Sequence, residues 1–530
     1  MKVDWLDQIS GRRIETIIRD IYSISKGPLK GRIAYAFTAI ENEIFRYIKS
    51  YVYELNSTYS YLNRNLDTYE DAIGNLYISL DSDKDKFAAC GSHVDSVING
   101  GAYDGVAGVA AGLEIFRVLY ENNVQAKCGF RIIVFRGEES SMTGEALMGS
   151  GVATGQIGPK KLHEMTYGLK EKIPFEFYMK GMRYNWLEIL ALSENPIIMP
   201  SQYSCYLEMH IEQGTVLEKA GLNVGVVGNG IGGAVRLELK TGLSQTKYEI
   251  KTDESLFVFK VKGRRNHTGG TPMNGVRGER YRDDALVKSA DLVEALINDG
   301  GGRMVKWYTK NFAYNIVPGQ VDFLMILKND WFDHVDLPAE IFEDFVEVKK
   351  DNYRGEREIW DKKTVISAAN VIRDVEQIGE HYAGLTDGLI CATIGGIGRV
   401  DKELILTFDL RNLDEKRRKE ALVDVKKSLK DNEFGYDLIA DSKPVYFGKK
   451  IPKALGLIYK ELFLKEPFYL PSMPGHDARN MAKLGIPTGM IFTACKDGVS
   501  HSVREYASPL ALEEGARLLG AGLVYFANRG

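Results

Sequence analysis

The sequence of 530 residues lacks several features that mark particular classes of protein. Its 68 lysine and arginine residues are offset by 72 aspartate and glutamate residues, and the net charge is −4. This balance gives no basic face, so we expect no nucleic-acid partner. Residues 1–13 contain no apolar signal core, and apolar runs fall short of the roughly 20 residues that span a bilayer. We therefore expect a cytoplasmic protein with no membrane partner.

Cysteine is also scarce. The five cysteines are odd in number, lie far apart and form no C-x-x-C pair. This spacing argues against both a zinc ribbon and a disulfide framework. Cys90, Cys128 and Cys205 lie in apolar, strand-like surroundings. These surroundings are typical of buried cysteines that act as small hydrophobic side chains.

The chain is too long for one ordinary core, so we expect two or more domains. Residues 87–95 (FAACGSHVD) and 130–135 (FRIIVF) have the composition of buried strands. Between them, apolar residues recur at helical spacing from 106 to 116, which places Asp104 at the start of a helix. Strand, helix and strand in this order indicate an open α/β sheet, whose sites lie at the carboxyl ends of the strands.

The texture changes near residue 225, where GVVGNGIGG reads as a hinge or a crossing between domains. Beyond it, strands such as FVFKVKG (257–263) alternate apolar and polar residues, which is typical of a smaller α+β domain. Residues 340–363 are dense in charge and predict an exposed helix. After residue 445 the alternation of helices and strands returns. We therefore expect one domain from residues 1–227 and 445–530, with residues 228–444 inserted as a second domain.

Histidine is rare, and its placement is informative. For a single histidine a role in the core or at the surface is the better interpretation, but several in unusual settings favour a functional site. Of the eight histidines, five lie beside glycine, small or acidic residues: His93, His210, His267, His476 and His501. The other three have ordinary surroundings and are expected to be exposed: His163, His334 and His381.

Acidic residues accompany these histidines. His93, Asp95 and Asp104 share a glycine-rich stretch, GSHVDSVINGGAYDG, in which glycines let the backbone bend tightly around a bound group. Glu138 and Glu139 follow the second buried strand. Two adjacent carboxylates at a strand end point in different directions, so one can bind a metal while the other acts as a base. The alternative is a solvated acidic turn, which explains the pair alone but not the whole set.

The motifs together resemble the amidase branch of the M20 metallopeptidase family, which holds N-carbamoyl-L-amino-acid hydrolases, β-ureidopropionases and allantoate amidohydrolases. The resemblance runs from about residue 70 to the C-terminus. It implies an α/β fold in which an open mixed sheet with flanking helices carries a two-metal site, with an inserted α+β lid and dimerisation domain. The motifs that carry it are, in order, GSHVDSV, GGAYDG, GEES, HIEQG, NHTGGTPM, NIVPG, GHDA and SHSVREY.

The resemblance assigns a metal role to five residues. Asp104 would bridge two divalent ions, which for three imidazoles and two carboxylates would be zinc or manganese, with cobalt or nickel as further options. His93 and His210 would complete the first site, and Glu139 and His501 would complete the second.

The resemblance also assigns residues around the metals. Glu138 would be the general acid and base, and Asp95 would orient His93. His267 would polarise the scissile carbonyl from the neighbouring subunit of a homodimer. On the substrate side, Asn315 would contact the carboxylate. The other substrate-side positions that match the family are Gln213 and His476.

One departure concerns the arginine that clamps the substrate carboxylate in the family. The strand after the VPG motif ends here with Lys328, whereas Arg411 has the family's D-x-R setting much further along the chain. An extra segment at about residues 329–395 would separate the two. Because a bidentate guanidinium differs from a lysine point charge, we favour Arg411 as the anchor.

These residues predict a binuclear metal-dependent hydrolase of a linear amide, the carbamoyl C–N bond of an N-carbamoyl amino acid or a related ureido acid. An aminoacylase or dipeptidase acting on N-acyl substrates with the same centre is the alternative. Release of ammonia rather than amine would separate them. A metal-binding pseudoenzyme is a third interpretation, which the presence of both Glu138 and His267 argues against.

Overall fold

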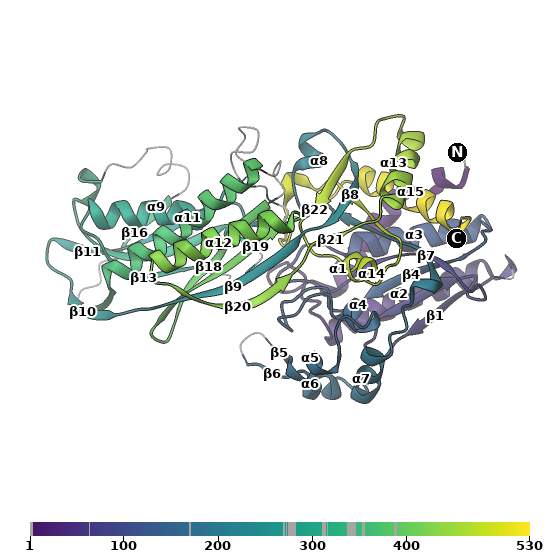
Figure 1. The fold of residues 1–530 in the computed structure, drawn as a ribbon, viewed down its shortest axis with the longest axis horizontal. Helices are drawn as coiled ribbons and strands as arrows, with labels where there is room; N and C mark the ends of the chain where they lie inside the picture. The colour runs from purple at the N-terminus through teal and green to yellow at the C-terminus, as the bar shows by residue number, and fades with distance from the viewer. Residues whose placement is uncertain are drawn as a thin grey trace. The chain divides into compact units, whose positions relative to one another are not determined.

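The computed structural model describes residues 4–62, 64–168, 171–268, 271, 273, 282–309, 314, 316–335, 346–351, 356–385 and 390–529. Contacts between Cα atoms divide the chain into two compact units. The first unit comprises Met1–Ile231 with Val445–Gly530, and the second comprises Gly232–Pro444. Figure 1 colours the chain from one end to the other.

The first unit is built on a mixed nine-stranded sheet with the order β1-β2-β4-β3-β7-β23-β8-β21, in which β22 also pairs with β8. Four neighbouring strands, β4, β3, β7 and β23, run parallel. The expected mixed α/β sheet is thereby confirmed. The strands are β1 (Leu66–Glu70), β2 (Leu76–Leu80), β3 (Phe87–His93), β4 (Gly129–Phe135), β7 (Tyr203–Ile211), β8 (Val224–Ile231), β21 (Val445–Tyr446), β22 (Tyr469–Ser472) and β23 (Thr488–Thr493).

Hydrophobic clusters cover both faces of this sheet. Along β4, Ile132 and Val134 join one cluster, while Ile133 and Phe135 join the other. A strand buried on both faces reads as a continuous apolar run, which is why FRIIVF does not alternate. The flanking helices include α1 (Gly11–Ser25), α2 (Ala39–Thr58), α3 (Val106–Glu121), α13 (Lys450–Phe463), α14 (Ala478–Lys483) and α15 (Pro509–Ala527). Among the described helices, none is both long and apolar enough to cross a membrane.

A smaller helical region of the first unit follows β4 and has its own apolar cluster, which includes Phe175 and Trp186. It contains α4 (Met148–Ala153), α5 (Pro159–Glu164), α6 (Phe175–Gly181) and α7 (Trp186–Glu194), with the short strands β5 (Thr166–Tyr167) and β6 (Ile173–Pro174).

The second unit contains two four-stranded sheets, with the orders β18-β19-β9-β20 and β13-β15-β11-β16. Two short pairs, β10 with β17 and β12 with β14, accompany them. The strands are β9 (Gly233–Gly242), β10 (Gln245–Glu249), β11 (Glu254–Lys262), β12 (Asn266–His267), β13 (Arg303–Thr309), β14 (Ile316–Val317), β15 (Gln320–Lys328), β16 (Val346–Asp351), β17 (Glu356–Trp360), β18 (Ile390–Val400), β19 (Glu403–Asn412) and β20 (Gly435–Ser442). The helices are α9 (Ala285–Asn298), α11 (Lys362–Leu385) and α12 (Glu415–Asp431).

The prediction of an exposed helix over residues 340–363 is wrong for the part that the structure describes. This part forms β16 and β17, and α11 begins only at Lys362. The strand β16 pairs with β11 along one edge, and its charged residues are exposed or half-buried. An edge strand with charged side chains has the same composition as a solvated helix, so charge density alone does not separate them.

The start of α3 offers a test of close packing behind the site. A Cβ atom at Gly108 would lie 2.3 Å from the Met209 carbonyl oxygen on β7. Alanine is the better helix former by about 0.5–1 kcal/mol, but this backbone contact cannot give way. We therefore expect Gly108→Ala to lower the free energy of unfolding in denaturant titrations.

The matched control is Gly384→Ala near the end of α11, where a Cβ atom would meet nothing within 4 Å. This substitution should raise the free energy of unfolding by up to about 1 kcal/mol. Equal effects of the two substitutions would contradict the packing argument.

Candidate metal centre

The parallel strands of the first unit bring the predicted ligands to one edge of the sheet. His93 is the last residue of β3, His210 lies near the end of β7, and Glu139 follows β4. Asp104 lies just before α3, and His501 follows β23. The carboxyl ends of parallel strands meet at one edge, so these residues, distant in sequence, converge. All five side chains are buried.

Asp104 lies between two groups of side chains. Its Oδ1 atom is 3.1 Å from His210 Nε2 and 4.0 Å from His93 Nε2. Its Oδ2 atom is 3.1 Å from His501 Nε2, which is 3.4 Å from Glu139 Oε1. In each group, His93–Asp104–His210 and Asp104–Glu139–His501, the potential ligand atoms lie within 4.8 Å of one another. The two groups share only Asp104, and each of its oxygens faces one of them.

The orientation of the imidazole rings fits a metal. His210 Nδ1 lies 2.8 Å from the Ile211 carbonyl oxygen, and His93 Nδ1 lies 3.3 Å from Asp95 Oδ1. An acceptor at Nδ1 favours the tautomer that carries its proton there and leaves the Nε2 lone pair free. His210 Nε2 also accepts a hydrogen bond of 3.2 Å from the Gly105 amide, as a lone pair would. Nitrogen and carboxylate ligands of this kind suit borderline divalent ions such as zinc or manganese.

The charges of the site also fit a cation. Burial raises the pKa of Glu139 to about 7 and raises the pKa of Glu138 well above its usual range. Burial opposes the charge of Asp104 as well, but the imidazoles of His210 and His501 beside its two oxygens hold its pKa well below its usual range. Buried carboxylates crowded in this way stay ionised near neutral pH only with positive charge between them, which divalent ions would supply.

Glycine is required next to the shared carboxylate. Gly105 has a φ of 68°, and a Cβ atom there would lie 2.5 Å from three atoms of the His93 ring. The turn into α3 therefore approaches the imidazole as only glycine allows. This contact gives one physical reason for the glycines in the stretch GSHVDSVINGGAYDG.

Asp95 does more than the orientation of His93 that the sequence predicts. Its two carboxylate oxygens accept hydrogen bonds from the backbone amides of Glu138, at 3.1 Å, and Glu139, at 3.0 Å. One buried carboxylate thus holds both the imidazole of the first group and the turn that carries the acidic pair. Glu138 Oε2 lies 3.8 Å from His93 Nε2, so Glu138 borders the first group.

Glu505 was missed by the sequence analysis. Its Oε1 atom accepts hydrogen bonds from the amides of Tyr103, at 2.7 Å, and Asp104, at 2.9 Å, while Oε2 accepts one of 3.2 Å from the His501 amide. The buried carboxylate therefore ties the Asp104 turn to the His501 loop, and burial raises its pKa to about 7. Its position four residues after His501, in SHSVREY, was the available signal.

Arg32 was also missed. This fully buried guanidinium donates to the Val94 carbonyl oxygen and, at 3.0 Å, to Ser25 Oγ. Burial lowers its pKa, whereas the charges of Glu505 and nearby site carboxylates raise it. A buried cation from the N-terminal segment thus faces the acidic cluster, and no local sequence pattern indicates it.

Two predicted substrate-side residues lie beside the metal groups. Gln213 Nε2 donates hydrogen bonds to Asp104 Oδ2, at 3.2 Å, and to Ser500 Oγ, at 2.9 Å. The ring centroid of His476 lies 4.4 Å from that of His210. Both residues are therefore in contact with the proposed ligands.

The remaining predicted residues belong to the second unit. His267 is buried on β12, opposite Ile316 of β14. Arg411 is buried on β19 and donates to Asp409, with a shortest distance of 3.0 Å, whereas Lys328 is exposed at the end of β15. Asn315 lies outside the described residues.

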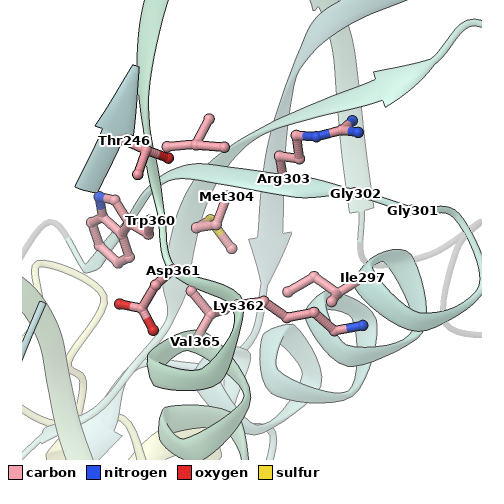
Figure 2. A pocket seen from close by; sticks show the side chains of 11 residues that line it. Thr246, Ile297, Gly301, Gly302, Arg303, Met304, Trp360, Asp361, Lys362 and Val365 are labelled. Carbon is pink, nitrogen blue, oxygen red and sulfur yellow. The ribbon is translucent and has the colours of Figure 1, made fainter. Parts of the chain in front are cut away.

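The second unit also contains a pocket of about 380 Å³ (Figure 2). Its lining includes Arg303, Met304, Trp360, Asp361 and Lys362. None of the predicted catalytic or metal-binding residues is among the residues that line it. The pocket is therefore distinct from the candidate metal centre, which rests on the buried side-chain groups around Asp104.

Residues 87–523 match the family model described as Peptidase family M20/M25/M40. The chain belongs to the M20 family. The match covers most of the chain, including all five candidate metal ligands. As a member of this family the protein is a hydrolase, and the family relationship that the motifs suggested is confirmed.

The similarity to relatives of known name extends over almost the whole of this chain. The N-carbamoyl-L-amino acid amidohydrolase of Geobacillus stearothermophilus is 24% identical over 521 residues, covering 96% of this chain and 97% of that one. The ureidoglycolate hydrolase of Oryza sativa is 23% identical, covering 96% of this chain and 82% of that one. A crystal structure of an amidase of the hydantoinase/carbamoylase family from Burkholderia multivorans matches with a TM-score of 0.55 at 20% identity, covering 98% and 99% of the two chains. This structure shows a shared fold.

The shared position of Asp104 generates a prediction about metal content. We expect the unchanged protein to bind about two divalent ions per chain. Asp104→Ala should lower occupancy at both positions, because each group loses a carboxylate oxygen, whereas His501→Ala should chiefly empty the second. Elemental analysis after dialysis measures both. Equal residual metal in the two variants would argue against a shared carboxylate.

Proposed function

We propose that this protein hydrolyses the carbamoyl C–N bond of an N-carbamoyl amino acid or a related ureido acid with two divalent metal ions, zinc or manganese. The observation that carries the proposal is the pair of buried side-chain groups joined by Asp104, with Glu138 at their border. The names of the relatives from Geobacillus stearothermophilus and Oryza sativa support ureido compounds as the substrate class.

The reaction consumes one water molecule. Two divalent ions in these groups would polarise the ureido carbonyl and increase the acidity of the attacking water. Glu138 takes a proton from this water and delivers it to the departing nitrogen, while Asp95 holds the backbone of the turn that carries Glu138. The water oxygen bonds to the carbonyl carbon and a C–N bond breaks. After loss of carbon dioxide the products are ammonia and the free amino acid.

Substrate binding is assigned to the remaining predicted residues. His267 donates a hydrogen bond to the developing oxyanion, a role that can be worth about 10²–10³ in rate. Arg411, with Asn315, binds the substrate carboxylate, and Gln213 and His476 border the reacting group. In the homodimer that the family resemblance implies, His267 would come from the partner chain.

The experiment that tests this function is an assay of metal-reconstituted protein against a panel of N-carbamoyl amino acids and other ureido acids. Ammonia release supports the proposal. Amine release from N-acyl amino acids or dipeptides, without ammonia from the ureido acids, would assign an aminoacylase or dipeptidase instead. Metal binding with no turnover of either panel would indicate a binding protein.

The assigned role of Glu138 predicts a separation of metal binding from turnover. Glu138→Gln keeps the shape of the side chain and removes the proton acceptor, so kcat should fall by about 10²–10⁴ while metal content is retained. Glu145→Gln, at a partly exposed glutamate paired with Lys161, is the matched control and should leave kcat unchanged. Near-normal turnover by metal-replete Glu138→Gln protein would remove Glu138 from the mechanism.

The proposed carboxylate anchor predicts a change in KM. Arg411→Lys keeps a positive charge but loses the planar fork, so KM should rise by about tenfold to a hundredfold with a smaller change in kcat. Lys328→Met serves as the comparison and should leave KM within a few-fold of the original. Steady-state kinetics on the best ureido substrate, with circular dichroism as a folding check, measures both. A rise in KM confined to Lys328→Met would transfer the anchor to Lys328.

A further inference from the structure

The second unit contains the same arrangement of elements twice. In what we call the host module, residues 233–242 and 362–442, the order along the chain is β9, α11, β18, β19, α12 and β20. In what we call the nested module, residues 254–351, the described elements include β11, α9, β13, β15 and β16 in that order. Each begins with the strand–helix–strand–strand of a ferredoxin-like fold and adds a fourth strand.

The two sheets have the same topology. The orders β18-β19-β9-β20 and β13-β15-β11-β16 both place the first strand between the third and the fourth, with the second strand at an edge. All neighbouring strands in both sheets are antiparallel. Three pairings in one sheet each have an equivalent in the other, which indicates a repeated module rather than a chance likeness of one hairpin.

One module is inserted into the other at a defined place. The chain leaves the host module after its first strand, β9, and returns just before its first helix, α11. The departing and returning segments, β10 and β17, form an antiparallel stem in which Gln245 lies opposite Trp360. The extra segment is therefore bounded by this stem, at residues 245–360. The range of about 329–395 expected from sequence overlaps only its last part.

The repeated topology explains why both Lys328 and Arg411 were candidates for the anchor of the substrate carboxylate. Lys328 ends β15, the third strand of the nested module, opposite Glu254 at the start of β11. Arg411 lies near the end of β19, the third strand of the host module, opposite Ala234 near the start of β9. The two residues thus occupy equivalent places in two modules, and the arginine has not moved along the chain.

The modules contact each other through equivalent elements. The two first helices, α9 and α11, pack together (Figure 1), and Arg373 of α11 forms ion pairs with Glu294 and, at 3.8 Å, Asp291 of α9. The two edge strands, β13 and β18, also lie together, and Thr309 Oγ1 is 3.3 Å from the Ile397 amide. Contacts between like elements are the mark of a two-fold interface between identical subunits.

A buried guanidinium joins the modules. Arg282 of the nested module donates to the Ala392 carbonyl oxygen, at 2.8 Å, and to Thr393 Oγ1, at 2.6 Å, on β18 of the host module. Its Nε atom is 3.4 Å from Glu376 on α11. Separating a fully buried arginine from its partners is strongly destabilising, so we expect this contact between the modules to be stable. Such a contact is typical of modules that remain packed together.

The inner and outer edges of the paired modules differ in exposure. Residues 390–397 of β18, at the inner edge, are buried, whereas most residues of β20, at the outer edge of the host module, are exposed. Unpaired edge strands are templates for association with another chain. Here the inner edge of the host module is already covered by the nested module of the same chain.

We propose that the nested module takes, within one chain, the place that a partner subunit's module would take, so that a single chain is the catalytic unit and each chain supplies its own His267. The proposal replaces the homodimer that the family resemblance implies. The test by activity rests on the proposed function, whereas the test by molar mass does not.

The first experiment measures molar mass in solution by light scattering and sedimentation over a wide dilution series. We expect the mass of one chain, 59.3 kDa, at every concentration at which activity is measured. If a stable species of twice that mass is found, we would introduce Leu438→Lys on the exposed outer strand β20 to dissociate that dimer. Dissociation of that dimer with activity retained would still support the single-chain unit, whereas loss of activity on dissociation would overturn it.

The second experiment co-expresses Glu138→Gln and His267→Ala chains that carry different affinity tags. We expect no co-purification of the two tags and no activity beyond the sum of the separate variants. Recovery of activity in doubly tagged material would show that His267 acts between chains and would overturn the proposal. If the unchanged protein turned over no ureido acid, the proposed function would fail, while mass and co-purification would still decide the single-chain inference.

Discussion

The candidate site depends on one buried carboxylate. Asp104 presents one oxygen to His210 and the other to His501, and no other residue belongs to both groups. Such a carboxylate must be held rigidly, because it cannot be solvated and has to face two directions. Glu505 holds its backbone amide, and Gly105 lets the chain turn away at once into α3. The parallel sheet, the glycine turn and the second layer of carboxylates all serve this placement.

The surroundings of the site are arranged in layers of charge. Inside are the imidazoles and carboxylates that suit divalent ions, and behind them Asp95 and Glu505 accept backbone amides from the turns that carry the inner residues. Arg32 adds a buried positive charge from the N-terminal segment. Because the backbone amides of these turns donate to the outer carboxylates, the loops that carry the candidate ligands keep their shape without hydrogen bonds to solvent.

The second unit contains two modules of the same topology, one inserted into the other. A module that would otherwise present an open inner edge carries a second copy of itself, inserted through the β10–β17 stem. The inserted copy bears His267, while the host bears Arg411, so residues of one proposed function are divided between the two modules.

The sequence alone indicated the candidate ligands and the core elements that carry them. His93, Asp104 and the Glu138–Glu139 pair could be predicted because strand ends and helix starts leave strong local patterns, and parallel strands must share an edge. Glu505 and Arg32 were missed because their partners are backbone groups distant in the chain, which no local pattern records. The exposed helix expected over residues 340–363 was wrong because only strand pairing, a tertiary property, distinguishes β16 and β17 from a charged helix. Local chemistry is written in consecutive residues, whereas pairing and insertion are decided when distant segments pack.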